Sequence, residues 1–398
     1  MQRILLLAST VVFFDTFFYS ALTPLLPHYT HELALGKTGA GVLAAAYPAG
    51  ALAGAIPSGV VAARAGVKRT VVVGLVAVAA CTVVFGIGDE AWQLDTARFV
   101  QGIASAFSWT GALAWLVAAA PAGRRGSLIG TAFGAAVGGA LFGPVLGGVA
   151  SLAGTGWTFG VVGVASLGLV AFAAATPASA PEEPQPLRVL FTAFADPRVL
   201  AGVWFVLLPA LLFGTLGVLA PLRLSHLGFG AVAIGAVFLC SAALESAMNV
   251  LIGRASDRHG TAPLILGGLV ASAVVAALLP WPGHAAVLAP LVVLAGLSFG
   301  SLFTPGMTLL THLSEARGLD YGYAFALVNL AWAPGQTLGA AGGGALANAT
   351  ADAVSYLVVA SVCALTLGAA WRRRTSTAWT TPSGRGSSAS SAPTTGAV

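Results

Sequence analysis

The chain has 398 residues, of which 57% are hydrophobic and only 8% are charged. A soluble domain carries about a quarter charged residues, so this composition excludes a water-soluble globular protein. The formal net charge of +5 is compatible with nucleic-acid binding only if the basic residues gather on one surface. The positions of these basic residues along the chain instead indicate the orientation of the protein, as described below.

The apolar residues fall into blocks of about 20, the length that crosses a hydrocarbon core of roughly 30 Å. The first block contains Asp15, is too long for the apolar region of a signal peptide and lacks a cleavage site, so we interpret it as a membrane helix. We therefore predict an all-α membrane protein with twelve transmembrane helices, at residues 4–27, 38–62, 69–88, 92–118, 126–150, 154–176, 198–220, 230–252, 262–280, 285–311, 320–346 and 349–371.

The basic residues indicate the orientation of these spans. With the N-terminus inside, only Lys37 and Arg223 fall in outer loops, whereas fifteen Lys and Arg residues fall in inner segments and Arg98 falls within a span. Because cytoplasmic loops are enriched in Lys and Arg, we predict a multi-pass protein of the plasma (inner) membrane with both termini in the cytoplasm. This orientation explains the positive charge without a nucleic-acid partner.

A Pro-rich, charged stretch that contains PASAPEEPQP divides the spans into two sets of six. We expect a six-helix half at 1–176, a cytoplasmic linker at 177–197, a second six-helix half at 198–371 and a disordered cytoplasmic tail at 372–398.

The two sets of spans share an internal repeat. The end of the second span and its following loop recur 194 residues later in the eighth span, and Gly41 and Gly235 keep this offset. A four-glycine ladder that starts at Gly139 in the fifth span recurs 196 residues later, from Gly335. Two related halves with the substrate bound between them are typical of transporters that work by alternating access.

The loop after the second span and its copy carry the most specific pattern in the sequence. The first copy contains Gly59, Arg64, Gly66, Lys68 and Arg69, and the second contains Gly253, Asp257, Arg258 and Gly260. These residues resemble the loop signature of the major facilitator superfamily, G-x3-D-R-x-G-[RK]-[RK], and the resemblance to the family runs from residue 4 to about 371. It implies the major facilitator fold, with two six-helix, pseudo-symmetric halves.

The first loop departs from the family pattern, because Ala63 stands where the family has Asp. The resemblance implies that this Asp helps to hold the cytoplasmic side shut in the outward-facing state. We therefore expect this latch to be weakened or rebuilt in the first half, whereas Asp257 and Arg258 keep it in the second. A basic loop that serves topology alone is the other interpretation.

Three further patterns resemble the twelve-span drug–proton antiporters of the superfamily. The fourth span contains Arg98-x2-Gln101-Gly102, and the first contains Asp15-Thr16 followed by Pro24 and Pro27. The fifth span matches the antiporter signature at Gly130, Gly139, Gly143, Pro144, Gly147 and Gly148. Small residues every fourth position let another helix pack closely, and an ordinary packing face is the alternative explanation. The resemblance implies export rather than uptake.

Three ionisable residues lie within spans, where each costs at least about 2.5–3.5 kcal/mol and so needs a partner or a function. Asp15 and Arg98 fall at similar depths, given a helical rise of 1.5 Å per residue. We expect Asp15 to be the protonation site and Arg98 its electrostatic partner; a static ion pair between two helices is the alternative. Glu245 is either a second proton site, an attractor of cationic substrates or a helix-packing carboxylate.

Several polar and aromatic residues on the spans are candidates for a substrate cavity. They are Phe18, Tyr19, Gln101, Trp109, Asn329 and Trp332. Carboxylates together with aromatic rings favour a lipophilic cation. Each of these residues also has an alternative role in helix packing.

The sequence thus predicts a secondary active transporter that expels small amphipathic or cationic compounds, coupled to protons, as a monomer in the lipid bilayer. The alternatives are an exporter of a metabolite such as a sugar or amino acid, and a non-transporting membrane sensor of the same fold. We expect no enzymatic activity and no cofactor. We also expect no metal site, because His28, His31 and Glu32 have only a weakly metal-like spacing.

Overall fold

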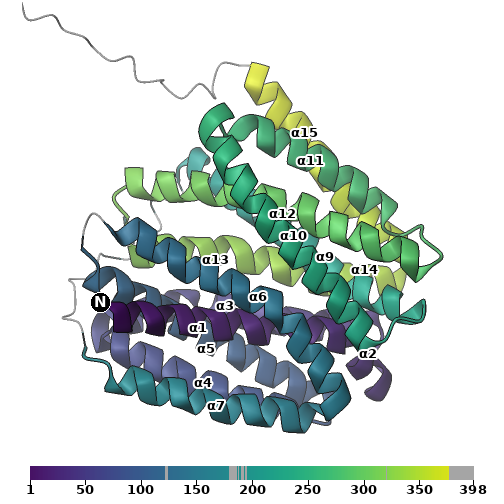
Figure 1. Cartoon of the computed structure of the whole chain (residues 1–398). Helices are drawn as coiled ribbons and strands as arrows, with labels where there is room; N and C mark the ends of the chain where they lie inside the picture. The colour runs from purple at the N-terminus through teal and green to yellow at the C-terminus, as the bar shows by residue number, and fades with distance from the viewer. Residues whose placement is uncertain are drawn as a thin grey trace, which may run out of the picture.

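The computed structural model describes residues 1–121, 124–178, 195–319 and 321–375, together with four residues between 186 and 192. The described backbone is almost entirely helical and contains no strand. Figure 1 shows the helices of the first half, coloured purple to teal, on one side of the molecule and those of the second half, coloured green to yellow, on the other. Most of the predicted linker and residues 376–398 of the predicted tail lie outside the described residues.

The helices of the first half are α1 (Gln2–Ser20), α2 (Leu22–Glu32), α3 (Lys37–Ala65), α4 (Val67–Ile87), α5 (Ala91–Ala119), α6 (Arg125–Ala153) and α7 (Thr155–Ala175). Helices α1 and α2 form one span, Gln2–Glu32, which is interrupted only at Ala21. This span is longer than predicted, so His28, His31 and Glu32 lie on a helix and not on the short outer loop that the sequence indicated.

The second half consists of α9 (Pro197–His226), α10 (Ala231–His259), α11 (Thr261–Leu278), α12 (Ala285–Ala316), α13 (Tyr321–Thr337), the π-helix η2 (Leu338–Gly342), α14 (Gly343–Ala349) and α15 (Asp352–Thr375). Within the described part of the chain, ten spans are long and apolar enough to cross a membrane. The predicted ninth span is a shorter apolar helix, Ala262–Leu278. The predicted eleventh is divided by η2, so no single regular helix covers it.

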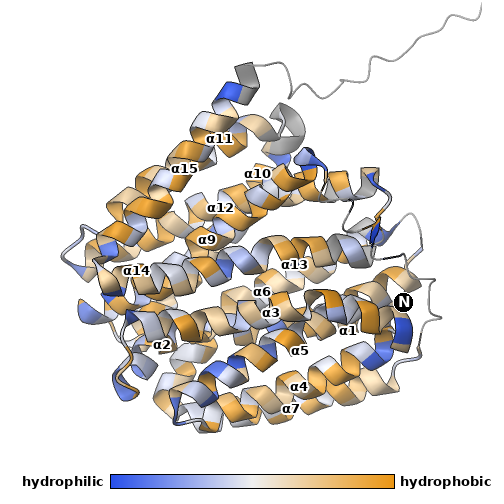
Figure 2. Ribbon diagram, turned by 180° about the vertical axis from the view of Figure 1, so that it is seen from behind, coloured by the Kyte–Doolittle hydropathy of each residue, from blue (hydrophilic) through white to orange (hydrophobic). Residues whose placement is uncertain are grey.

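The surface of the bundle fits a bilayer. Large apolar side chains are exposed along the helices, for example Val73, Leu152 and Leu365, and Figure 2 shows hydrophobic colour over most of their length. Trp92, Trp157 and Trp281 are more than 60% exposed; the first two lie in the first turns of α5 and α7, and Trp281 lies in the loop between α11 and α12. Tryptophan is enriched at membrane–water interfaces, so these positions mark one interface.

The two ends of the bundle differ in their charged residues. We call the end that carries Lys37, the α4–α5 loop and the α9–α10 loop the Lys37 face, and the opposite end, with Arg64, Lys68, Arg69 and Arg254, the basic face. Gly66 and Gly260, 194 residues apart, both lie on the basic face with φ of +88° and +78°. Both begin a helix in a conformation that residues with a Cβ rarely adopt, so the motif glycine has a backbone role.

The glycine ladder of α6 packs against α1. A Cβ on Gly139 would overlap the carbonyl oxygen of Phe13, and a Cβ on Gly143 would meet Ser20 and the carbonyl of Phe17. The Thr16 hydroxyl adds a hydrogen bond of 2.7 Å to the Ala136 carbonyl of α6. Close backbone approach therefore explains why these positions need glycine.

The same contacts recur in the second half. Gly335 and Gly339 pack against the carbonyls of Leu207 and Leu211 on α9, which lie 194 residues after Phe13 and Phe17. The internal repeat is therefore present in the helix packing as well as in the sequence. It makes α1 equivalent to α9, and α6 equivalent to α13 with η2.

We expect Gly139→Ala to destabilise the protein by about 1–3 kcal/mol, because an added methyl group in a closely packed contact forces the helices apart. Gly134, also on α6, has no atom within 4 Å of the position that a Cβ would take, so Gly134→Ala is the matched control and should not destabilise. Thermal unfolding in detergent measures both changes. Equal losses in the two variants would contradict the packing role.

The two halves meet at the Lys37 face. A Cβ on Gly41 of α3 would lie 2.5 Å from the Ala340 carbonyl oxygen, and one on Gly235 of α10 would lie 2.8 Å from that of Pro144. Lys37 Nζ bonds Asp352 at 2.5 Å. Toward the basic face, by contrast, Gly130 and Gly134 of α6 and Gly253 of α10 have nothing within 4 Å of a Cβ position. The close contacts of these glycines with the opposite half are therefore found near the Lys37 face and not near the basic face.

Candidate substrate cavity and proton site

A cavity of about 280 Å³ lies between the halves, near the middle of the bundle. Helices α1, α3, α5 and α6 line it from the first half, and α12 and α13 line it from the second. Its wall is mostly apolar and aromatic, with a few polar groups, as is typical of small-molecule sites. The lining residues are Asp15, Thr16, Tyr19, Tyr47, Ala51, Ser105, Ala106, Trp109, Phe133, Ala140, Phe303, Met307, Val328, Asn329, Trp332 and Gln336.

Asp15 is the carboxylate of this cavity. It is 7% exposed, and three side chains donate hydrogen bonds to its Oδ2 atom. The Tyr47 hydroxyl and the Ser105 hydroxyl each lie at 2.8 Å, and Trp109 Nε1 lies at 2.6 Å. These donors come from α3 and α5, so the packing of three helices fixes the orientation of the carboxylate.

The second oxygen of Asp15 is different. Oδ1 is buried and has no hydrogen-bond partner among the residues that the structure describes. A buried carboxylate oxygen without a partner is costly, because the group has lost its water and gained nothing in return. A proton on this oxygen, or a cation in the cavity, would remove that cost. This makes Asp15 the candidate proton site of the cavity.

Arg98 and Asp15 do not form a direct ion pair. The Arg98 guanidinium donates to the carbonyls of Phe18 and Tyr19 at 3.2 and 3.1 Å, and to Gln101 Oε1 at 3.0 Å. Tyr47 lies between the two charges: its hydroxyl bonds Asp15, and its ring centre is 5.0 Å from the guanidinium carbon. The interpretation of a static ion pair between α1 and α5 is therefore wrong. The Tyr47 side chain therefore separates Arg98 from Asp15.

Tyr19 closes the cavity on the side of the Lys37 face. Its ring packs against Tyr47 at 4.9 Å and against Trp332 at 5.6 Å, between ring centres. Its hydroxyl accepts a hydrogen bond of 2.8 Å from Gln336 of the second half. Beyond Tyr19 lies a separate small chamber of about 40 Å³, which Tyr19 and Gln336 also line.

Four of the six predicted cavity residues line the cavity: Tyr19, Trp109, Asn329 and Trp332. The other two do not. Phe18 is 2% exposed in the hydrophobic core, where its ring packs against Phe14 and Phe17. Gln101 bonds Arg98 and the Thr82 hydroxyl, so its amide is used in joining α5 to α4.

The sequence reading missed Tyr47, Ser105, Phe133, Phe303, Met307 and Gln336 as lining residues. Ser105 was detectable, because it lies one helical turn before Trp109 and so shares its face. Tyr47 carried no local signal, and Gln336 was visible only as a polar residue on a span, which is more often a helix-packing residue than a ligand contact. They depend on how α3 and α13 are rotated against α1.

Glu245 lies apart from this cavity, on α10 against α12. Its side chain fills the space that a Cβ on Gly300 would need, and it lies in hydrogen-bonding contact with Asn249, which accepts a 3.1 Å bond from Thr304. The structure does not bring Glu245 together with Asp15. This placement fits the helix-packing interpretation.

The loop motifs lie at the basic face. Arg64 and Arg69 are exposed, and the side chains of Asp257 and Arg258 lie outside the described residues. The role of these residues in holding the cytoplasmic side shut therefore stays a prediction.

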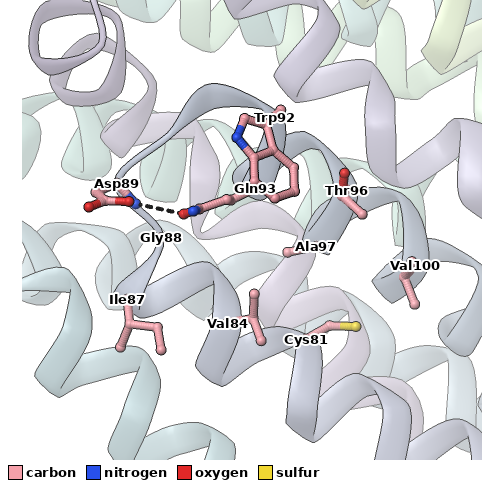
Figure 3. A pocket seen from close by; sticks show the side chains of 10 residues that line it. All are labelled: Cys81, Val84, Ile87, Gly88, Asp89, Trp92, Gln93, Thr96, Ala97 and Val100. Atoms are coloured by element: carbon pink, nitrogen blue, oxygen red, sulfur yellow. Dashed lines mark hydrogen bonds between the residues drawn. The ribbon is translucent and has the colours of Figure 1, made fainter.

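A second hollow lies on the flank of the first half, between α4 and α5 near the Lys37 face (Figure 3). Cys81, Val84 and Val100 line it, and at its end the backbone N–H of Asp89 donates to Gln93 Oε1 at 3.2 Å. Its volume is about 520 Å³, but every lining residue comes from the first half. It is a groove in the lipid-facing surface and is not part of the cavity between the halves.

A long apolar helical bundle with related halves and a central cavity defines the class of multi-pass membrane transport proteins. The family model of the Major Facilitator Superfamily matches residues 8–319 and 210–395, and the chain belongs to this family. The family consists of transporters and not enzymes. No curated protein sequence matches the chain significantly.

Solved structures share the fold at low sequence identity. A bacterial homolog of the human lysosomal transporter Spinster, in an inward-facing and occupied conformation, is 16% identical with a TM-score of 0.77, over 93% of this chain and 97% of that one. A D-xylose–proton symporter is 16% identical with a TM-score of 0.70, over 93% and 96%. A nucleoside transporter is 16% identical with a TM-score of 0.72, over 93% and 99%.

Proposed function

We propose that this chain is a proton-coupled exporter of small amphipathic or cationic compounds that works by alternating access as a monomer. The observation that carries the proposal is Asp15, a buried carboxylate in a cavity between two halves, with one oxygen that has no partner. A proton and a cationic substrate would compete for this group. Such competition couples their movements in opposite directions.

The cavity wall supports the substrate class. Tyr19, Trp109 and Trp332 surround the carboxylate with aromatic rings, which attract cations and bind flat apolar groups. The volume of about 280 Å³ lies near the lower end of the range for drug-sized ligands, roughly 300–1,000 Å³. We therefore propose compact monovalent cations with an apolar body.

The arrangement of the halves supports alternating access. We propose that the basic face is cytoplasmic, in the plasma (inner) membrane, with both termini on that side. The contacts at Gly41, Gly235 and Lys37 then close the outer side, and the lack of such contacts at Gly130, Gly134 and Gly253 supports a cavity that opens inward. An inward-open exporter is poised to collect its substrate from the cytoplasm.

A second candidate is the export of a polar metabolite such as a sugar or amino acid. The amides of Asn329 and Gln336 and the hydroxyl of Ser105 line the same cavity and can bond hydroxyl or carboxyl groups. A non-transporting sensor would bind its ligand in the same place but move nothing.

Flux measurements in proteoliposomes separate these functions. A pH gradient is imposed, and the movement of matched cationic, neutral and anionic solutes is followed with and without a protonophore. The proposal predicts gradient-dependent flux of cations, accompanied by opposite proton movement. Neutral solute flux alone would favour the metabolite exporter, and binding without any flux would favour the sensor.

The Lys37–Asp352 pair provides a test of the closed face. Its side chains are 38% and 17% exposed, so we expect it to stabilise closure by about 0.2–1 kcal/mol, or up to roughly fivefold in population. The test uses a protein in which the three native cysteines are replaced and Thr23→Cys, behind this face, is the only thiol. Asp352→Asn should increase the rate at which a thiol reagent labels this cysteine. The charge reversal Lys37→Asp with Asp352→Lys should restore the slow rate. If the reversal labels as fast as Asp352→Asn, the ion pair does not hold the face closed.

A further inference from the structure

The small chamber behind Tyr19 has its own polar groups. It has a volume of about 40 Å³, and Arg98, Thr23 and Tyr19 line it together with apolar side chains such as Leu26 and Phe213. A single water molecule needs roughly 10–15 Å³ of such volume, so the chamber can hold a small solute. It is far too small for a substrate of the kind proposed for the central cavity.

Arg98 lines this chamber, and not all of its hydrogen-bond donors have a partner among the described residues. The residue is 2% exposed, and its guanidinium has five N–H groups. Three of these donate, to the carbonyls of Phe18 and Tyr19 and to Gln101, whereas Nε is buried and has no partner. No carboxylate lines the chamber, and Asp15 is held on the other side of the Tyr47 ring. The nearest surroundings of this buried positive charge therefore contain no anion.

Two further donors line the same chamber. The Thr23 hydroxyl has no hydrogen-bond partner within the described part of the chain. The Tyr19 hydroxyl accepts from Gln336, which leaves its own hydrogen available. Donors with one full positive charge and no negative group form the kind of site that binds an anion, because a buried charge is costly unless it is paired.

We propose that this chamber binds a single small monovalent anion, of the halide class, next to Arg98. The unpartnered donors require a ligand with negative charge, and the volume of the chamber limits the size of that ligand. The Tyr19–Gln336 hydrogen bond separates the anion from the central cavity. This site does not depend on the proposed transport function, because it rests on the surroundings of Arg98 alone.

Direct binding tests the proposal on the purified full-length protein. Radioactive chloride binding is measured by a scintillation proximity assay, with bromide and gluconate as competitors at constant ionic strength. We expect saturable binding with about one chloride per chain. Bromide should displace it, and gluconate should not, because gluconate does not fit the chamber.

The variant Thr23→Val removes one donor and keeps the shape of the side chain. It should weaken chloride binding by about tenfold, the loss typical of one hydrogen bond to a charged group. Thr30→Val is the matched control on the same helix, because the Thr30 hydroxyl bonds its own helix at Pro27 and does not line the chamber. It should bind chloride like the parent.

Thermal unfolding provides an independent measurement. Chloride should raise the melting temperature of the parent and of Thr30→Val relative to gluconate, and Thr23→Val should need about ten times more chloride for the same rise. An absence of saturable chloride binding in the parent would mean that the chamber holds only water, and would overturn the proposal. Equal chloride affinity in Thr23→Val and the parent would also overturn it.

Discussion

Asp15→Asn is expected to reduce pH-gradient-driven flux by about two orders of magnitude while leaving the protein folded. The asparagine oxygen can still accept hydrogen bonds from Tyr47, Ser105 and Trp109. Its amide would take the place of Oδ1, the atom that has no partner. The substitution therefore keeps the geometry and removes only the group that carries the proton.

The measurement compares gradient-driven flux with thermal stability in the same preparations. Asp89→Asn is the matched control, because Asp89 is exposed at the Lys37 face, far from the central cavity, and should transport like the parent. The melting temperature of Asp15→Asn should be at least that of the parent. Full gradient-driven transport by Asp15→Asn would remove Asp15 from the coupling mechanism.

The double variant Gly41→Ala with Gly235→Ala should shift the protein toward a state that is open at the Lys37 face. Each added methyl group would press on a backbone carbonyl of the opposite half, Ala340 or Pro144. Overpacking of this kind costs about 1–3 kcal/mol. Because the cost falls only on the closed state, we expect the ratio of open to closed molecules to rise about tenfold or more.

Distances between spin labels at Glu90→Cys and Ala351→Cys, one on each half near this face, report the change. The parent should show a short distance, and the double variant should add a longer one. Gly267→Ala is the control, because nothing lies within 4 Å of a Cβ at that position. A lower melting temperature with unchanged distances would instead assign Gly41 and Gly235 to folding alone.

These two predictions test different steps of the proposed cycle. Asp15 concerns the charge that the cavity binds, and the two glycines concern the side to which the cavity opens. We expect Asp15→Asn to lose coupling with an unchanged distance distribution, and the glycine variant to shift the distances. Together these results would show that binding and gating can be altered separately.

Whether a feature could be predicted from the sequence depends on how far apart in the chain the interacting residues lie. The apolar spans were largely predictable, because the length of an apolar block is a local property. The ends of α1–α2 and the π-helix η2 were not, because hydropathy does not report a break at Ala21 or an extra residue in a helical turn. The repeat was visible because the same backbone contact requires glycine at both copies, as at Gly139 and Gly335.

The sequence by itself therefore determined that this is a helical membrane protein with two related halves, and that Asp15 and Arg98 are buried charges in the first half. Only the tertiary structure decided their partners. The three bonds to Asp15 join residues 32, 90 and 94 positions apart, and Gln336 reaches Tyr19 across 317. Such contacts depend on the rotation of each helix against its neighbours, which no local pattern specifies. For this reason the packed helices place Tyr47 between Asp15 and Arg98, where the sequence left a direct ion pair open as one alternative.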